Sequence, residues 1–164
     1  MGLKRIAGKG AQVFMKKEEF HNHLLQELTS RMNDLEQAWR DLMESNQQEG
    51  KSSAGDKHET GAAMIHLEME QLGKQLEDLK KQVEEAVRWS PENVNMLGRV
   101  AMGSLVETTS GLYYMITGYG KLMVQDKEVF VIGAASPVGK VLMGKLPGES
   151  FEWGKVNGVI CSID

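Results

Sequence analysis

Asp56 and Glu59 are two carboxylates three positions apart in a short polar stretch, Lys51 to Thr60. On a helix, residues three apart lie on one side, so both groups can point the same way. Mg²⁺ prefers oxygen ligands, and one or two carboxylates plus groups from a partner are a common protein shell for it. The pair predicts an incomplete magnesium site, in which a partner macromolecule supplies the remaining ligands and the metal activates water for phosphodiester hydrolysis.

The same stretch also has a structural interpretation. Ser53 and Asp56 match a capping box, and Glu59 would be an acidic residue that the helix dipole favours near a helix start. Lys57 and His58 flank the pair. His58 is either a third ligand or proton shuttle, or a solvated histidine. Both interpretations of the acidic pair stay open on spacing alone.

Long heptad-like patterns lead into this stretch and out of it. Apolar residues alternate at intervals of three and four, which is typical of a coiled coil. The residues before the stretch are Leu25, Leu28, Met32, Leu35, Trp39 and Leu42, and those after it are Ile65, Met69, Leu72, Leu76, Leu79, Val83 and Ala86. The two stripes pair in a constant antiparallel register that folds back near residues 53 and 54. The pattern predicts a helical hairpin over 16–89, about 50 Å long at ~1.5 Å per residue, with its tip at 50–60.

Composition limits the remaining possibilities. A chain of 164 residues makes one or two small domains. It contains no run of eighteen apolar residues and no signal-peptide core, so we expect a cytoplasmic protein without a membrane partner. Its single cysteine, Cys161, excludes an internal disulfide and is expected to be a small buried hydrophobe.

Charge is distributed unevenly along the chain. Residues 16–89 carry sixteen acidic and ten basic side chains, which disfavours duplex DNA and predicts no sequence-specific DNA binding. Residues 1–15 carry three basic side chains, no acidic ones and several glycines, so they are expected to form a flexible basic arm.

After a linker at 90–94, short β-forming segments separated by glycines predict a small antiparallel sheet over 95–164. The expected segments are 100–106, 112–117, 128–134, 150–153 and 156–163. Ser136, Pro137 and Gly144 predict one short helix between the third and fourth segments, with a serine cap, a proline at the first turn and a closing glycine. The predicted fold is therefore α+β, with a coiled-coil hairpin followed by a sheet domain.

Two regions of the sequence resemble the Gre transcript-cleavage factors. Gly55-Asp-Lys-His-Glu59 is similar to the tip signature of that family. The run Ala135-Ser-Pro-Val-Gly-Lys-Val-Leu-Met-Gly-Lys145 is similar to a conspicuous segment of its C-terminal domain, as are Gly98-Arg-Val, Tyr114-Met-Ile-Thr-Gly and Pro147-Gly-Glu.

The resemblance implies an FKBP-like C-terminal domain and a hairpin that enters the secondary channel of bacterial RNA polymerase. Asp56 and Glu59 would then help hold the polymerase's second catalytic Mg²⁺ while the polymerase, as the enzyme, cleaves backtracked RNA. Contact with RNA would be indirect. By position, Lys57, His58 and Thr60 would be tip contacts, and Ser136, Pro137 and Lys145 would dock at the channel mouth.

The tip departs from the family pattern in one respect. Thr60-Gly-Ala-Ala63 stands where the family has Asn-Ala-Glu-Tyr, so an amide, an acid and an aromatic ring are missing. A Gre-like regulator that binds the channel without stimulating cleavage is therefore an alternative.

Two further alternatives come from other classes of protein. A prolyl isomerase would need an aromatic pocket, and the expected strands offer only Tyr113, Tyr114, Phe130, Phe151 and Trp153. A dimerising scaffold would instead bury additional apolar hairpin residues, namely Leu24, Ala38, Met43 and Leu67, against another chain.

Overall fold

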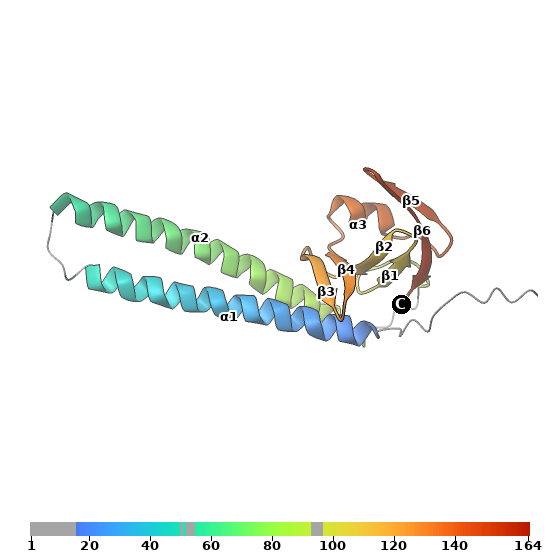
Figure 1. Cartoon of the computed structure of the whole chain (residues 1–164), viewed down its shortest axis with the longest axis horizontal. Helices are drawn as coiled ribbons and strands as arrows, with labels where there is room; N and C mark the ends of the chain where they lie inside the picture. Colours follow the sequence, from blue (N-terminus) through green and yellow to red (C-terminus); the bar gives the residue numbers. More distant parts are fainter. Residues whose placement is uncertain (1–15, 50, 52–54, 93–96) are drawn as a thin grey trace, which may run out of the picture.

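The computed structural model describes residues 16–49, 51, 55–92 and 97–164, without the side chains of residues 49 and 55–58. Two long helices, α1 (Lys17–Glu49) and α2 (Gly55–Arg88), form an antiparallel hairpin that extends away from a six-stranded sheet (Figure 1). Helices of 33 and 34 residues are each about 50 Å long. The predicted helical hairpin is confirmed.

The interface between the two helices is buried at one end only. Leu24 and Leu28 are fully buried where the sheet covers α1, whereas Leu35 and Trp39, farther along, are only partly buried. Two helices alone cannot enclose a core, so the apolar side chains between them become less buried where the hairpin extends beyond the sheet.

Gly73 gives the Trp39 ring room against α2. A Cβ atom at Gly73 would lie 3.4 Å from Trp39 Cζ3. The constant register predicted for the two stripes pairs Trp39 with Met69, one helical turn nearer the tip. Side chains on a helix lean toward its N-terminus, so the Trp39 ring reaches back along α1 toward the sheet and meets Gly73. The register of the other predicted pairs stays a prediction.

The C-terminal part is a mixed sheet with one short helix, α3 (Pro137–Leu142). Its strands are β1 (Leu105–Thr108), β2 (Gly111–Met115), β3 (Gly120–Val124), β4 (Lys127–Ile132), β5 (Ser150–Trp153) and β6 (Val156–Ile163). Their order across the sheet is β3-β4-β2-β1-β6-β5. The predicted α+β architecture and the serine-capped helix are therefore confirmed.

Three details of the sheet differ from expectation. The expected sheet was antiparallel, but β2 and β4 pair in parallel. The reason is that β3, which lies between them in the chain, is placed at the edge of the sheet beyond β4. The strand β3 itself was not predicted. Cys161 was expected to be buried and is exposed. It follows the buried Ile160 on β6 and so faces the opposite side of the sheet.

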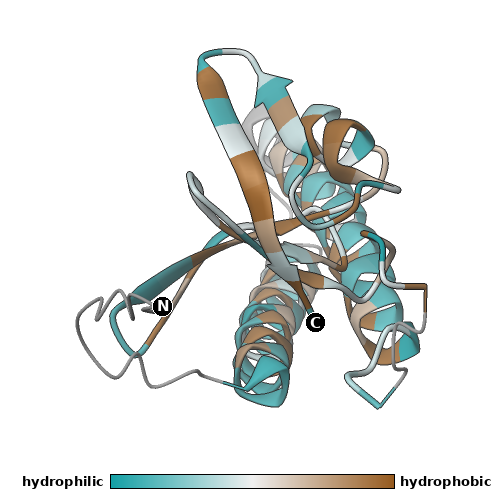
Figure 2. Ribbon diagram, turned by 90° about the vertical axis from the view of Figure 1, so that its right-hand side faces the viewer, coloured by the Kyte–Doolittle hydropathy of each residue, from teal (hydrophilic) through white to brown (hydrophobic). Residues whose placement is uncertain are grey.

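The sheet separates two hydrophobic cores. Tyr113 and Met115 on β2 face the core under α3, and Tyr114 and Ile116 face the core under α1 and α2. This strict alternation is the two-residue period of a strand covered on both faces. Figure 2, seen from the sheet end, shows the long helices and α3 on different sides of the strands. The base of the hairpin is thus part of the protein's main core.

Candidate functional site at the hairpin tip

The acidic pair lies at the end of the hairpin farthest from the sheet. α2 begins at Gly55, so the backbone of Asp56 and Glu59 is helical and places them three positions apart on the first turns of α2. The Glu59 side chain is exposed, and Thr60 beside it is exposed as well. The side chains of Asp56, Lys57 and His58, and the capping residue Ser53, lie outside what the structure describes.

After Thr60, the next three residues of α2 add no side-chain oxygen. Gly61 and Ala62 are half-buried and Ala63 is exposed, and none carries a polar side chain. Within the described parts of the chain, no three His, Cys, Asp or Glu side chains come together to hold a metal ion. Because Mg²⁺ takes more ligands than two carboxylates supply, a metal held by Asp56 and Glu59 would need further ligands.

Large apolar side chains are exposed along the outer part of the hairpin. Met43 is 40% exposed, Met64 62% and Leu67 57%. Ala38 is half-buried. Leu24, expected among the residues free to contact another chain, is instead completely buried at the base, because the sheet covers that part of α1. Met43, Met64 and Leu67 are therefore open to a partner on the outer hairpin, and Val87, near the sheet on α2, is exposed as well.

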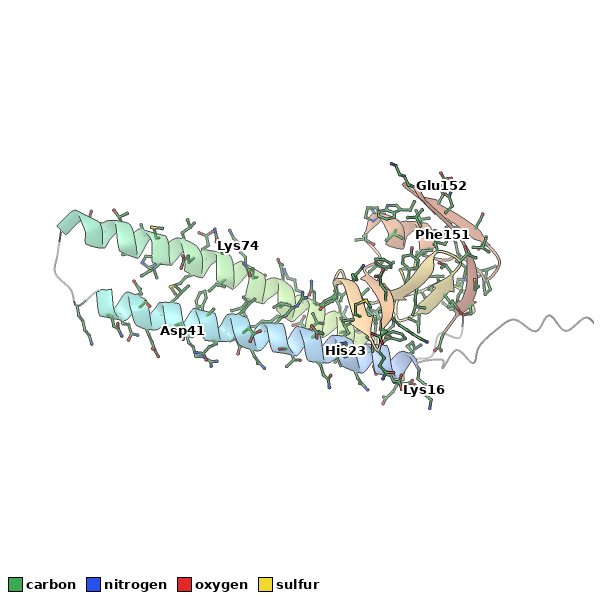
Figure 3. All side chains as sticks on the ribbon, viewed as in Figure 1. Lys16, His23, Asp41, Lys74, Phe151 and Glu152 are labelled. Atoms are coloured by element: carbon green, nitrogen blue, oxygen red, sulfur yellow. The ribbon has the colours of Figure 1, made fainter. Side chains whose placement is uncertain are left out.

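Surface pairs spaced four residues apart support the hairpin from outside. Lys74 Nζ lies 2.8 Å from Glu70 Oε1, and Gln37 Nε2 donates to Asp41 Oδ1 at 2.8 Å. The Lys74 ammonium lowers the pKa of Glu70, and the carboxylate raises that of Lys74. Figure 3 shows Asp41 and Lys74 on the part of the hairpin that extends beyond the sheet. Exposed pairs of this kind add little stability.

A buried polar contact fixes the base of α1 to the sheet. His21 is 3% exposed, and its Nδ1 atom shares a hydrogen bond of 2.9 Å with the Tyr114 hydroxyl on β2. Burial, followed by the charge of Lys17, lowers the pKa of His21. Burial, with help from Asp164 and Glu18, raises the pKa of Tyr114. His21 is therefore held neutral beside a protonated tyrosine.

The loop between β2 and β3 contacts both helices of the hairpin. The Arg31 guanidinium on α1 lies 4.5 Å from the centroid of the Tyr119 ring. The Tyr119 hydroxyl donates to Glu27 Oε2 at 3.4 Å, and Gln82 Nε2 on α2 donates to the Gly118 carbonyl at 3.2 Å. We call these contacts the loop clamp. Sequence analysis did not identify this clamp or the His21 contact, because each joins residues from distant parts of the chain.

The three predicted docking residues lie around α3. Ser136 caps the helix, since its Oγ accepts from Gly139 N at 3.0 Å and donates to the Gly133 carbonyl at 2.7 Å. Pro137 is exposed at the first helical turn. Lys145 is half-buried and lines a groove of about 650 Å³ beside β5 and β6. Ser136 thus has a structural role already, whereas Lys145 is placed at a concave surface.

The aromatic residues of the sheet are mostly used in packing. The Tyr113 ring stacks on Phe130 with centroids 5.6 Å apart and meets Phe151 edge-on at 6.1 Å. Tyr114 is fully buried in the other core, and Trp153 is 42% exposed. Four of the five rings therefore contribute to the two cores and not to an aromatic-lined pocket.

No helix in the described part of the chain combines the length and the hydrophobicity needed to span a bilayer.

No protein-family profile matches the sequence, and no curated protein matches it significantly. Among solved structures, the chain is similar to the transcription factor Gfh1, with 16% identity, a TM-score of 0.36, and coverage of 86% of this chain and 93% of that one. It is also similar to GreA factor homolog 1 of Thermus thermophilus, at 14% identity and a TM-score of 0.34, over 87% of this chain and 95% of that one. A third similar structure is Gfh1 of Thermus aquaticus, at 16% identity and a TM-score of 0.32, over 87% and 94% of the two chains. At these TM-scores the likenesses carry no argument about this chain's activity.

Proposed function

We propose that this chain is a Gre-like transcription factor that inserts its hairpin tip into the secondary channel of bacterial RNA polymerase. The observation that carries the proposal is the position of the acidic pair at the far end of a helical hairpin whose helices are each about 50 Å long. A rod of two helices is thin enough to enter a channel that is too narrow for a globular domain. The exposed Glu59 carboxylate is available to a partner there.

The tip acids would share a Mg²⁺ ion with the polymerase. Asp56 and Glu59 supply two carboxylate ligands, and the polymerase and water supply the others, which suits the coordination that Mg²⁺ prefers. When bound, the ion would provide the activated water for hydrolysis of backtracked RNA. This chain would position the metal and contact RNA only indirectly, while the polymerase performs the cleavage.

A second candidate is a channel-binding regulator without cleavage stimulation. The observation that favours it is the surface after Glu59, where Gly61, Ala62 and Ala63 offer neither an acid nor an aromatic ring. A hairpin that enters the channel without aligning the metal would block it and inhibit elongation.

A cleavage assay on a backtracked elongation complex tests both candidates. The proteins compared are the wild type, Asp56→Asn, Glu59→Gln and the control Glu68→Gln, which changes another exposed acid on α2. We expect the wild type and the control to stimulate cleavage over polymerase alone, and both tip variants to lose most of the stimulation while still binding. Inhibition by the wild type would favour the regulator. If the wild type neither binds the polymerase nor changes RNA cleavage, both candidates are refuted.

Two further measurements separate the structural alternatives. If Asp56 serves only the start of α2, Asp56→Ala lowers the free energy of unfolding by about 1 kcal/mol, whereas Asp56→Asn changes it little, and neither alters any polymerase effect. If the exposed Met64 and Leu67 serve a dimer, sedimentation shows a tight dimer that Leu67→Gln dissociates. A monomer that binds polymerase argues against the scaffold.

A further inference from the structure

A groove of about 740 Å³ lies where the start of α1 meets the sheet. Its floor is apolar and comes from three elements, with Phe20 on α1, Leu105 on β1 and Leu112 on β2. Phe20 and Leu105 are buried, while Leu112 is half-buried. The groove is therefore an apolar surface at the junction of hairpin and sheet, remote from the tip.

The rim of the groove carries more acidic than basic side chains, and one of the acids, Glu128, is already paired with Lys121. Its acidic side chains are Glu18, Glu107, Glu128 and Asp164, and its basic ones are Lys16, Lys17 and Lys127. Lys17 is buried, with its Nζ atom 3.9 Å from Asp164 Oδ1. Asp164 remains 72% exposed and can accept a second cation. A basic segment with apolar residues suits such a site.

Residues 1–15, which lie outside the described part of the chain, have the charge that this rim favours. The segment contains no acidic residue, and its charged side chains are Lys4, Arg5 and Lys9. It runs directly into Lys16, which lines the groove. The segment therefore starts at the groove and complements its charge.

The end of this segment is apolar, like the floor of the groove. Val13, Phe14 and Met15 are consecutive, and successive side chains of an extended chain point to opposite sides, so either side of the segment offers an apolar group to the floor. At about 3.3 Å per extended residue, Phe14 is about 7 Å of chain from Lys16. The aromatic ring is thus within reach of the floor.

We infer that residues 1–15 dock in this groove of the same molecule, with Phe14 over Leu105 and Leu112 and the basic side chains beside Glu107 and Asp164. Tethering makes this contact feasible even if it is weak, because a short linker gives an effective concentration in the millimolar range. Since α1, β1, β2 and β6 all contribute to the groove, the docked segment joins the start of the hairpin to the sheet. The inference does not depend on the proposed function.

Paramagnetic relaxation in the full-length chain tests the inference. A spin label is attached through Gly8→Cys, with the exposed Cys161 changed to serine so that one site reacts. The matched variant has the same label and length and carries the substitutions Lys4→Gln, Arg5→Gln, Lys9→Gln and Phe14→Ser. We expect the amides of Leu105, Glu107 and Leu112 to broaden about twofold or more over the matched variant, because docking raises the local concentration beyond that of a free tether.

Two controls sharpen the outcome. Glu107→Lys should reduce the broadening toward that of the matched variant, and the amides of Val141 and Phe151, beside a different groove, should stay unaffected throughout. Equal broadening in the wild-type segment and the matched variant would overturn the inference. A mixture of ¹⁵N-labelled chains and separate spin-labelled chains tests contact between molecules. Broadening in that mixture would also overturn the inference, since a second copy would then occupy the groove.

Discussion

The Nδ1 atom of His21 lies 2.9 Å from the Tyr114 hydroxyl oxygen and joins α1 to β2 across 93 positions of sequence. Both residues are buried, and their rings meet edge-on with centroids 6.1 Å apart. Lys17 on α1 and the Asp164 and Glu18 carboxylates are the charged groups that act on this pair. The contact is therefore a buried polar link between the hairpin and the sheet, beside the apolar residues of the core.

Protein stability should fall in acid because of His21. Its pKa in the folded state is lowered by burial and by Lys17, so the folded protein prefers the neutral ring. The stability that comes from the neutral ring is fully present above the pKa of histidine in the unfolded chain, about 6.5. It is lost as the pH falls below that pKa toward the lower pKa of the folded state. Urea unfolding at pH 7.5 and pH 5.5 should show the loss.

The matched control for this pH effect is His23→Gln, because His23 is half-exposed on the same helix. His23→Gln should keep the acid sensitivity, and His21→Gln should remove much of it. An unchanged pH dependence in His21→Gln would show that another group is responsible.

Gly73→Ala should stabilise the hairpin. A Cβ atom there makes an ordinary contact of 3.4 Å with Trp39 Cζ3, while alanine is favoured over glycine inside a helix by about 1 kcal/mol. Thermal unfolding should therefore shift upward. Gly73→Leu has the opposite expectation, because its longer side chain displaces the Trp39 ring. A destabilising alanine would mean that the ring cannot tolerate even one methyl group.

Tyr119→Ala should loosen the hairpin from the sheet. The substitution removes the ring beneath Arg31, worth about 0.5–1 kcal/mol at an exposed site, and the hydroxyl contact to Glu27. Distances between spin labels on α1 and β5 should broaden in pulsed electron resonance. Tyr119→Phe keeps the ring and should preserve the narrow distribution. Equal distributions in the alanine variant and the wild type would show that the loop clamp does not set the hairpin's direction.

Ser136 and Lys145 should respond differently to substitution. Ser136→Ala removes the cap of α3 and should cost about 1 kcal/mol of stability. Lys145→Ala should leave stability nearly unchanged and weaken polymerase binding, measured by co-purification at increasing salt. The control is Lys140→Ala, an exposed lysine on the same helix. Equal binding by all three variants would exclude Lys145 from the docking surface.

The long helices and α3 could be predicted because their signals are local. Heptad spacing specified α1 and α2, and Ser136 and Pro137 specified the start of α3. The strand β3 could not be predicted, since its turn into β4 is formed by Gln125 and Asp126, both with positive φ, in place of the glycine that usually marks such a turn. The parallel pairing of β2 with β4 is a property of the whole sheet and leaves no mark in either strand.

The candidate site was predictable only in its backbone position. Spacing placed Asp56 and Glu59 on one helix at the end of a hairpin, which the structure confirms. Magnesium binding by these residues stays a prediction, because the ligands that would complete the site belong to another molecule. The residues that join the hairpin to the sheet, His21, Tyr114 and Tyr119, carry no sequence pattern, since their partners are far from them in the chain, such as Glu27, which lies 92 positions from Tyr119.

The loop clamp contacts α1 no farther out than Arg31. From Arg31 to Glu49, α1 continues for about 27 Å beyond the last of these contacts. Over that length, bending by about 10° moves the end of the helix by about 5 Å, which exceeds the length of a metal–oxygen bond. If the tip acids share a metal with a partner, as proposed, their placement depends on the stiffness of the outer hairpin. Substitutions at Trp39 and Gly73 would then change that placement without altering the tip.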